Sequence, residues 1–88
     1  MLERRVRIIN QLGLHARAAA KLVKLVNTCD STVVLKSDGG EADAAAILDV
    51  LAMAAGYGTF VEIVVDGPDE QEAITKIAEL FLDGFGEL

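Results

Sequence analysis

The 88-residue sequence has few residues of the kinds that form crosslinks or metal sites, because it contains one cysteine and one histidine. The single cysteine, Cys29, excludes an internal disulfide, and we interpret it as a small packing residue rather than a reactive thiol. One histidine and one cysteine also lack the ligand spacings of a zinc site, and a lone histidine disfavours a catalytic triad. We therefore expect no metal and no cofactor, and a reducing cytoplasm as the location.

Long apolar segments and net positive charge are also missing. No stretch is long and apolar enough to span a bilayer, and residues 1–5 lack the apolar region of a signal peptide, so we expect no membrane insertion. The formal net charge of −6 argues against nucleic acid as a partner. All basic residues except Lys76 nevertheless lie within residues 1–37, around His15. This basic half is either an ordinary solvated surface or a positive field that favours phosphate and acidic protein partners.

Apolar periodicity and turn residues predict an α+β fold with the element order βαββαβα. We expect strands over residues 2–9, 31–36, 41–44 and 59–66, and helices over residues 16–27, 45–54 and 70–83. Asp38 and Gly39 are typical of a turn between the second and third strands, and Gly84 is typical of a helix end. A length of 88 residues predicts one domain over 1–88, with helices packed on one face of a sheet.

The only histidine lies where a glycine-containing loop enters the helix predicted over residues 16–27. Backbone N–H groups in a first helical turn have no intrahelical partner, and the helix dipole favours negative charge there, so such a terminus accepts phosphate readily. The imidazole of His15 is a nucleophile near neutral pH, and Arg17 can pair with an anion through its guanidinium group. These features predict a phosphoryl group carried on His15. The alternative is a solvated histidine at an ordinary helix start.

The run from Ile8 to Val23, with Gly-Leu-His-Ala-Arg at its centre, closely resembles the active-site segment of the HPr family. HPr is the histidine-containing phosphocarrier of the bacterial phosphoenolpyruvate:sugar phosphotransferase system. The likeness continues through residues 38–39, 56–59 and 67–73 and covers essentially the whole chain. The resemblance implies an open-faced sandwich, in which three helices cover one side of a four-stranded antiparallel sheet.

The resemblance also implies a relay and not an enzyme with its own turnover. Enzyme I, charged by phosphoenolpyruvate, phosphorylates the family histidine on Nδ1, and the phosphohistidine then donates to a IIA domain of a sugar permease. The matching phosphohistidine is His15, and Arg17 matches the arginine that accompanies the phosphoryl group. The phosphate is expected beside Ala16, Arg17 and Ala18 at the helix start. The carrier is expected to be a monomer.

Partners in this family dock on the first helix and on a short second helix beside the histidine. The matching positions are Ala16, Ala20, Lys24, Ile47, Leu48 and Leu51. The alternative for the last three of these residues is simple burial in the core. A helix as short as the one predicted over residues 45–54 cannot bury all of its apolar residues against one sheet. We therefore expect Leu48 and one neighbour to be exposed.

The sequence departs from the family at four positions. Ala18 replaces the usual proline, so the helix start has an additional N–H donor and a looser backbone. Ala46 replaces a serine that a regulatory kinase phosphorylates in many relatives, so that control is expected to be absent. Ala45 and Asp49 stand where relatives often have lysines, which weakens the positive rim. Two other functions stay open: an HPr-like regulator in a nitrogen-type phosphotransferase chain, and a small interaction module with an incidental histidine.

Overall fold

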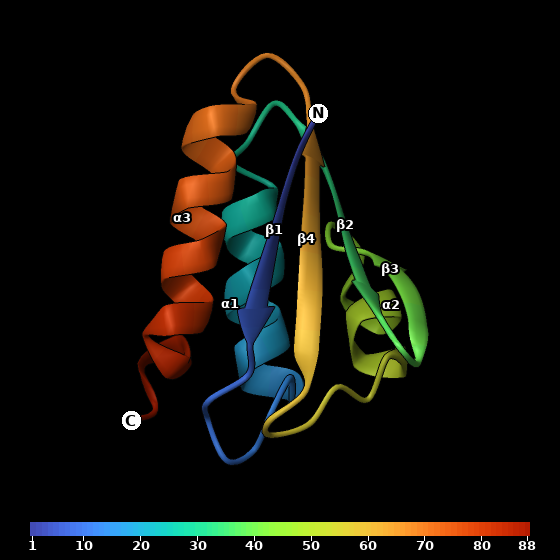
Figure 1. Cartoon of the computed structure of the whole chain (residues 1–88), viewed down its shortest axis with the longest axis vertical. Helices are drawn as coiled ribbons and strands as arrows, with labels where there is room; N and C mark the ends of the chain where they lie inside the picture. The colour runs from blue at the N-terminus through green and yellow to red at the C-terminus, as the bar shows by residue number, and fades with distance from the viewer.

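A computed structural model describes residues 1–88, and its element order is the βαββαβα expected from the sequence (Figure 1). The strands are β1 (Leu2–Arg7), β2 (Thr32–Ser37), β3 (Gly40–Asp43) and β4 (Phe60–Asp66). The helices are α1 (Ala16–Val26), α2 (Ile47–Ala52) and α3 (Glu70–Leu82), followed by a 3₁₀ turn over Gly84–Gly86. None of the helices is long and apolar enough to cross a membrane.

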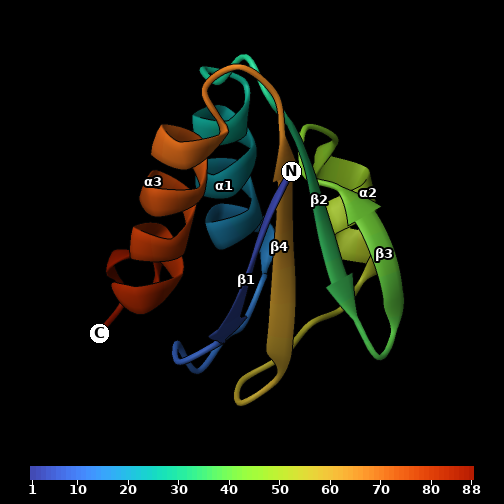
Figure 2. The ribbon, with the colours of Figure 1, turned by 45° about the horizontal axis from the view of Figure 1, so that its top comes forward.

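The four strands form one antiparallel sheet in the order β1-β4-β2-β3, so β4 lies between β1 and β2. The register runs from Leu2 opposite Val65 to Arg7 opposite Phe60 on one side of β4. All three helices lie on the same side of the sheet, and the other face is open (Figure 2). The predicted open-faced sandwich is therefore confirmed.

The core lies between β4 and the two long helices. In β4 the alternating side chains Val61, Ile63 and Val65 are fully buried, as expected of strand residues that face a helical layer. Val64 belongs to the opposite face and is nevertheless buried, because β4 is a central strand and Val34 pairs with it from β2.

The chain after α3 folds back onto the core. Gly84 has φ +59°, the left-handed conformation that ends a helix, so its predicted role as a helix stop is confirmed. Phe85 is fully buried, and its ring packs edge-on against Phe81 with 4.9 Å between the ring centroids. This packing fixes the path of residues 86–88 beside the start of α1.

Both ends of α2 and the end of β1 differ from the predictions by two residues, and every other boundary agrees to within one residue. Helix α2 begins at Ile47 and not at residue 45, because Asp43 Oδ1 accepts a hydrogen bond from the backbone N–H of Ala45 and Ala46 keeps an extended backbone. Strand β1 ends at Arg7 although Ile8 still exchanges backbone hydrogen bonds with residues 58 and 59. Beyond Ile8 the chain turns toward α1, and this turn positions the histidine.

Candidate functional site

The loop between β1 and α1 is shaped by Gly13. Its φ is +65°, and a Cβ atom there would lie 2.6 Å from the carbonyl oxygen of Ala55. The next residue, Leu14, donates a backbone hydrogen bond of 2.9 Å to the same oxygen and is buried. The loop is therefore held against the segment that follows α2. This contact places His15 at the start of α1 and next to α2.

The first turn of α1 presents free N–H groups. His15 is the N-cap residue, with an extended backbone (φ −73°, ψ 178°), and its carbonyl oxygen accepts the N–H of Ala19 at 2.8 Å. The N–H groups of Ala16, Arg17 and Ala18 donate no hydrogen bond within the molecule. Ala16 and Arg17 are exposed, whereas Ala18 is fully buried, so its N–H group is not at the surface. No acidic residue lies in this turn. The helix still begins at Ala16 although Ala18 replaces proline, and the terminus can accept an anion.

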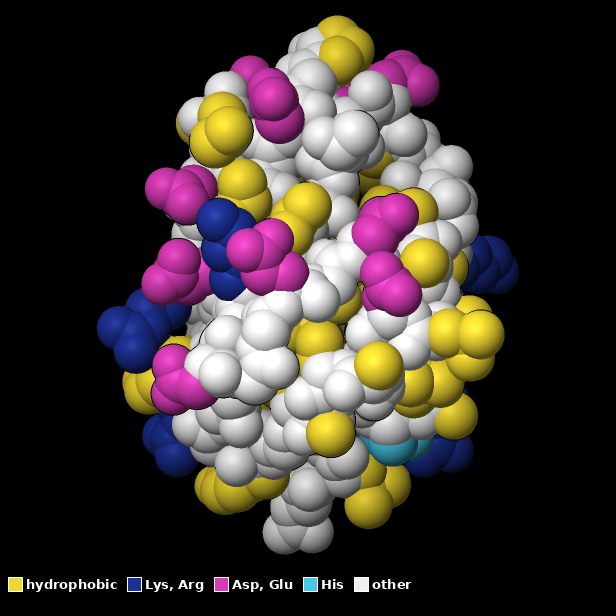
Figure 3. All heavy atoms as spheres, turned by 90° about the vertical axis from the view of Figure 1, so that its right-hand side faces the viewer, with side chains coloured by type: hydrophobic (Ala, Val, Ile, Leu, Met, Phe, Trp, Pro, Cys, Tyr) yellow, Lys and Arg dark blue, Asp and Glu magenta, His cyan; other side chains and the backbone are white.

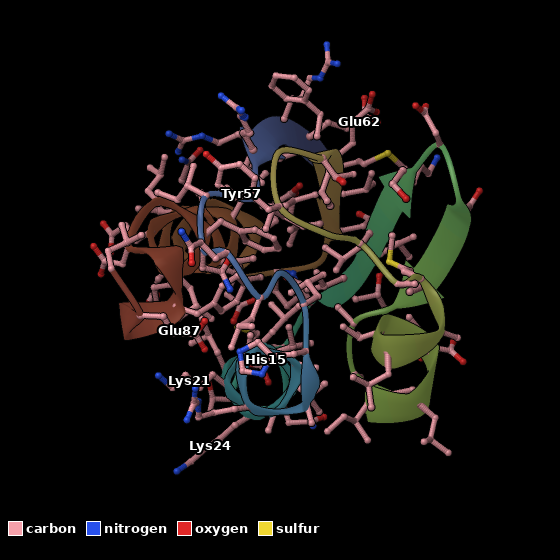
Figure 4. The ribbon with its side chains drawn as sticks, turned by 90° about the horizontal axis from the view of Figure 1, so that it is seen from below. His15, Lys21, Lys24, Tyr57, Glu62 and Glu87 are labelled. Atoms are coloured by element: carbon pink, nitrogen blue, oxygen red, sulfur yellow. The ribbon has the colours of Figure 1, made fainter.

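The side chain of His15 contacts a carboxylate from the far end of the chain. Its Nε2 lies 2.5 Å from Oε2 of Glu87, and Nε of Arg17 lies 3.5 Å from the same oxygen. Figure 4 shows His15 and Glu87 side by side, with Lys21 on the same side of α1. No other hydrogen bond to the His15 ring is present, so Nδ1 has no partner.

Asn10 holds the other side of this carboxylate. Its Nδ2 donates to Oε1 of Glu87 at 3.0 Å and to the carbonyl oxygen of Gly13 at 2.8 Å. The hydrogen bond from Asn10, followed by that from His15, lowers the pKa of the Glu87 carboxyl below its ordinary value. The carboxyl is therefore ionised at neutral pH and can only accept hydrogen bonds. It follows that Nε2 of His15 carries the proton.

Sequence reasoning predicted His15 and Arg17 as site residues but did not predict that Asn10, Glu87 and Lys21 lie beside them. Lys21 Nζ donates to the carbonyl oxygen of Phe85 at 2.6 Å and thereby ties the chain end to α1. His15 and Glu87 are 72 residues apart, and no local pattern links such distant positions. Asn10 lies inside the segment that resembles the HPr family. The position of a single asparagine in the sequence, however, does not indicate which residues its buried amide contacts.

The surface beside His15 is partly apolar. The side chains of Ile47 and Leu48 are exposed by 38% and 77%, whereas Val50 is fully buried and Leu51 is half-buried. The expectation that Leu48 and one neighbour are exposed is confirmed. Figure 3 shows hydrophobic side chains gathered next to the histidine on the face that α2 provides. From α1, the predicted docking residues Ala16, Ala20 and Lys24 are exposed as well.

A hollow lies beside Arg17 and Glu87, the two residues whose side chains meet at His15. It has a volume of about 530 Å³ and is lined by Ile9, Gln11, Leu12, Arg17, Tyr57, Glu87 and Leu88. The side chain of Arg17, at the edge of this hollow, is two-thirds exposed. The histidine therefore sits at the surface between two apolar patches, with cationic and N–H donors around it. This arrangement can hold an anion and remain open to a protein partner.

Comparison with known proteins identifies the family. The model of the phosphotransferase-system HPr component phosphorylation site matches residues 2–83. This chain belongs to the HPr family. It is 47% identical to the phosphocarrier protein HPr of Cupriavidus necator, over 99% of this chain and 98% of the relative. It is also 47% identical to the phosphocarrier protein NPr of Proteus mirabilis, over 96% of this chain and 94% of that protein.

The fold agrees with this membership. A crystal structure of HPr from Thermoanaerobacter tengcongensis superimposes with a TM-score of 0.95 at 32% identity, covering 100% of this chain and 99% of that one. The relatives named HPr and NPr are both phosphocarrier proteins, so this chain is a phosphocarrier component of the phosphotransferase system.

Proposed function

We propose that this HPr-family protein accepts a phosphoryl group on His15 from phosphoenolpyruvate-charged enzyme I and passes it to a IIA domain of a sugar permease. The observation that supports this assignment is the position of the only histidine at a helix start whose N–H groups have no partner. The proposed location is the cytoplasm.

Chemistry at the site is consistent with Nδ1 as the acceptor. Nε2 is engaged by Glu87, whereas the Nδ1 lone pair is free. A phosphoryl group on Nδ1 would be near the first turn of α1, where the N–H groups of the exposed residues Ala16 and Arg17 and the helix dipole offset its negative charge. Arg17 adds a cation that a phosphoryl group can reach, since its side chain is mostly exposed. Phosphoryl transfer depends mainly on positioning and charge stabilisation, and these groups supply both without a deep pocket.

Docking is proposed on the face made by α1 and α2. Ile47 and Leu48 supply exposed apolar contacts, Leu51 supplies a half-buried one, and Lys24 supplies a charge. An apolar centre with a polar rim is the usual anatomy of a transient protein interface. The small side chains of Ala16 and Ala20 allow a partner's backbone to approach α1 closely, near His15.

The second candidate function is that of a phosphocarrier in a nitrogen-type phosphotransferase system. Identity to an NPr equals identity to an HPr, at 47% in each case. Asp49 also adds negative charge to the docking face, which a sugar-branch partner with an acidic surface would disfavour. Sugar uptake in a strain that depends on this carrier would separate the two candidates.

The decisive experiment is incubation with phosphoenolpyruvate and a cognate enzyme I. Intact mass spectrometry is expected to show one acid-labile phosphate on the wild-type chain and none on His15→Ala. A reaction without enzyme I is the control. An acid-labile phosphate that survives in His15→Ala would refute the assignment, and a wild-type chain that stays unmodified would refute the carrier function.

A further inference from the structure

The carboxylate of Glu87 is fixed by hydrogen bonds in a mostly buried position, unlike a freely exposed surface carboxylate. Its side chain is 14% exposed, and it accepts hydrogen bonds from Asn10 on one oxygen and from His15 on the other. Asn10 is itself 1% exposed and is fixed by its bond to Gly13. The buried ring of Phe85 anchors the turn that brings Glu87 to this place.

A carboxylate in this position decides which imidazole nitrogen is a nucleophile. A neutral imidazole has one N–H group and one nitrogen lone pair, and the hydrogen bond of one nitrogen fixes the state of the other. An ionised Glu87 can only accept, so it keeps the proton on Nε2 and leaves the lone pair on Nδ1. We propose that Glu87 is a positioning residue that selects Nδ1 of His15 as the phosphoryl acceptor. This proposal rests on the proposed carrier function.

The transfer step balances without any proton movement. The Nδ1 lone pair forms the bond to phosphorus, while the bond between phosphorus and the donor atom of enzyme I breaks and its electron pair stays on that donor. The His15 ring keeps its Nε2–H and becomes a cationic N-phosphoimidazolium. Glu87 already faces this ring 2.5 Å from Nε2 and serves as its counter-ion. A carboxylate plays the same two parts toward histidine in serine proteases, where it orients the ring and stabilises the imidazolium.

The variant Glu87→Gln separates this role from a merely structural one. The amide oxygen of the new glutamine would still accept the bond from Asn10, which leaves its NH₂ group facing Nε2 of His15. Nε2 would then have to accept, so the proton would move to Nδ1 and block the nucleophile. Glu87→Ala removes the preference without reversing it. If Glu87 has only a structural role, Glu87→Gln should impair the protein less than Glu87→Ala. If Glu87 selects the tautomer, Glu87→Ala should impair phosphorylation less than Glu87→Gln.

The experiment has two readouts. Long-range ¹⁵N–¹H spectra of the unphosphorylated protein at alkaline pH report the tautomer of the neutral imidazole. We expect the Nε2–H form in the wild type, a mixture in Glu87→Ala and mainly the Nδ1–H form in Glu87→Gln. The initial rate of phosphorylation by enzyme I is expected to fall about threefold in Glu87→Ala and about tenfold or more in Glu87→Gln, as the loss of a charge-assisted hydrogen bond predicts.

The control variant is Glu79→Gln, which makes the same charge change on an exposed position of α3 and is expected to leave both readouts unchanged. If Glu87→Gln keeps the Nε2–H tautomer and is phosphorylated at the wild-type rate, the proposal is wrong while the carrier function stands. If enzyme I does not phosphorylate the wild type, the carrier function fails. The tautomer spectra need no enzyme I, so they distinguish the two failures.

Discussion

Helix α2 offers a sharp test of the docking face, because Leu48 and Val50 point to opposite sides of it. Leu48 is 77% exposed and Val50 is fully buried. Truncation of Val50 to alanine removes two buried methyl groups and leaves a cavity, which costs about 2 kcal/mol of the free energy of unfolding. For a domain of this size, that loss lowers the melting temperature by about 8–16 °C. Phosphorylation of the folded Val50→Ala variant is expected to be nearly normal.

Leu48→Asp should show the reverse behaviour. An exposed substitution changes the free energy of unfolding by about 0.5 kcal/mol or less, and an aspartate in the first turn of a helix interacts favourably with the dipole. Loss of an apolar anchor at the centre of a small interface costs about 2 kcal/mol of binding, or about 30-fold in the concentration of carrier that half-saturates enzyme I. Thermal melts and a phosphorylation titration measure the two effects. A variant that melts as early as Val50→Ala yet saturates enzyme I normally would show that Leu48 is core.

Three further predictions concern the loop, the arginine and pH. Gly13→Ala is expected to lower the free energy of unfolding by about 2 kcal/mol, since a left-handed backbone costs an alanine about 1–2 kcal/mol and its Cβ would collide with Ala55. Thermal melts measure this loss, and Gly56→Ala, where a Cβ meets nothing within 4 Å, is the matched control. Arg17→Ala should keep the melting temperature but slow phosphoryl transfer about tenfold in at least one direction, measured in rapid-quench assays; equal rates would show that the helix terminus suffices. The pKa of Asp69 is lowered by the N–H of Asp30 and the hydroxyl of Ser31, so this carboxylate stabilises the fold above its ordinary pKa and loses that effect as the pH falls through the folded-state value. Denaturant titrations across the acid range should therefore show Asp69→Asn less stable than the wild type at neutral pH and equal to it at the acid end.

The sequence predicts the element order because each element carries its own local pattern. The alternation of Val61, Ile63 and Val65 and the turn residue Gly84 act through neighbours in the chain, and the structure confirms both. The predicted start of α2 is wrong by two residues, because the hydrogen bond that Asp43 Oδ1 accepts from the N–H of Ala45 outweighs the helix propensity of alanine.

One part of the candidate site was likewise predictable from the local sequence, and the other part was not. The place of His15 at a helix start follows from local periodicity, whereas the partner of its Nε2 does not. Glu87 reaches the ring only because Phe85 adopts φ +56° and buries its side chain, and both depend on how α3 packs against the rest of the molecule. Tertiary packing of this kind leaves no periodic trace in the residues around either partner.

The strand order also has a consequence for synthesis of the protein. Strand β1 pairs only with β4, and the carboxylate beside His15 comes from Glu87, which follows α3 in the chain. Chains emerge from the ribosome N-terminus first, so the histidine motif is exposed long before β4 exists to hold β1 and before Glu87 has been added. A nascent or truncated chain therefore carries the motif without the assembled site.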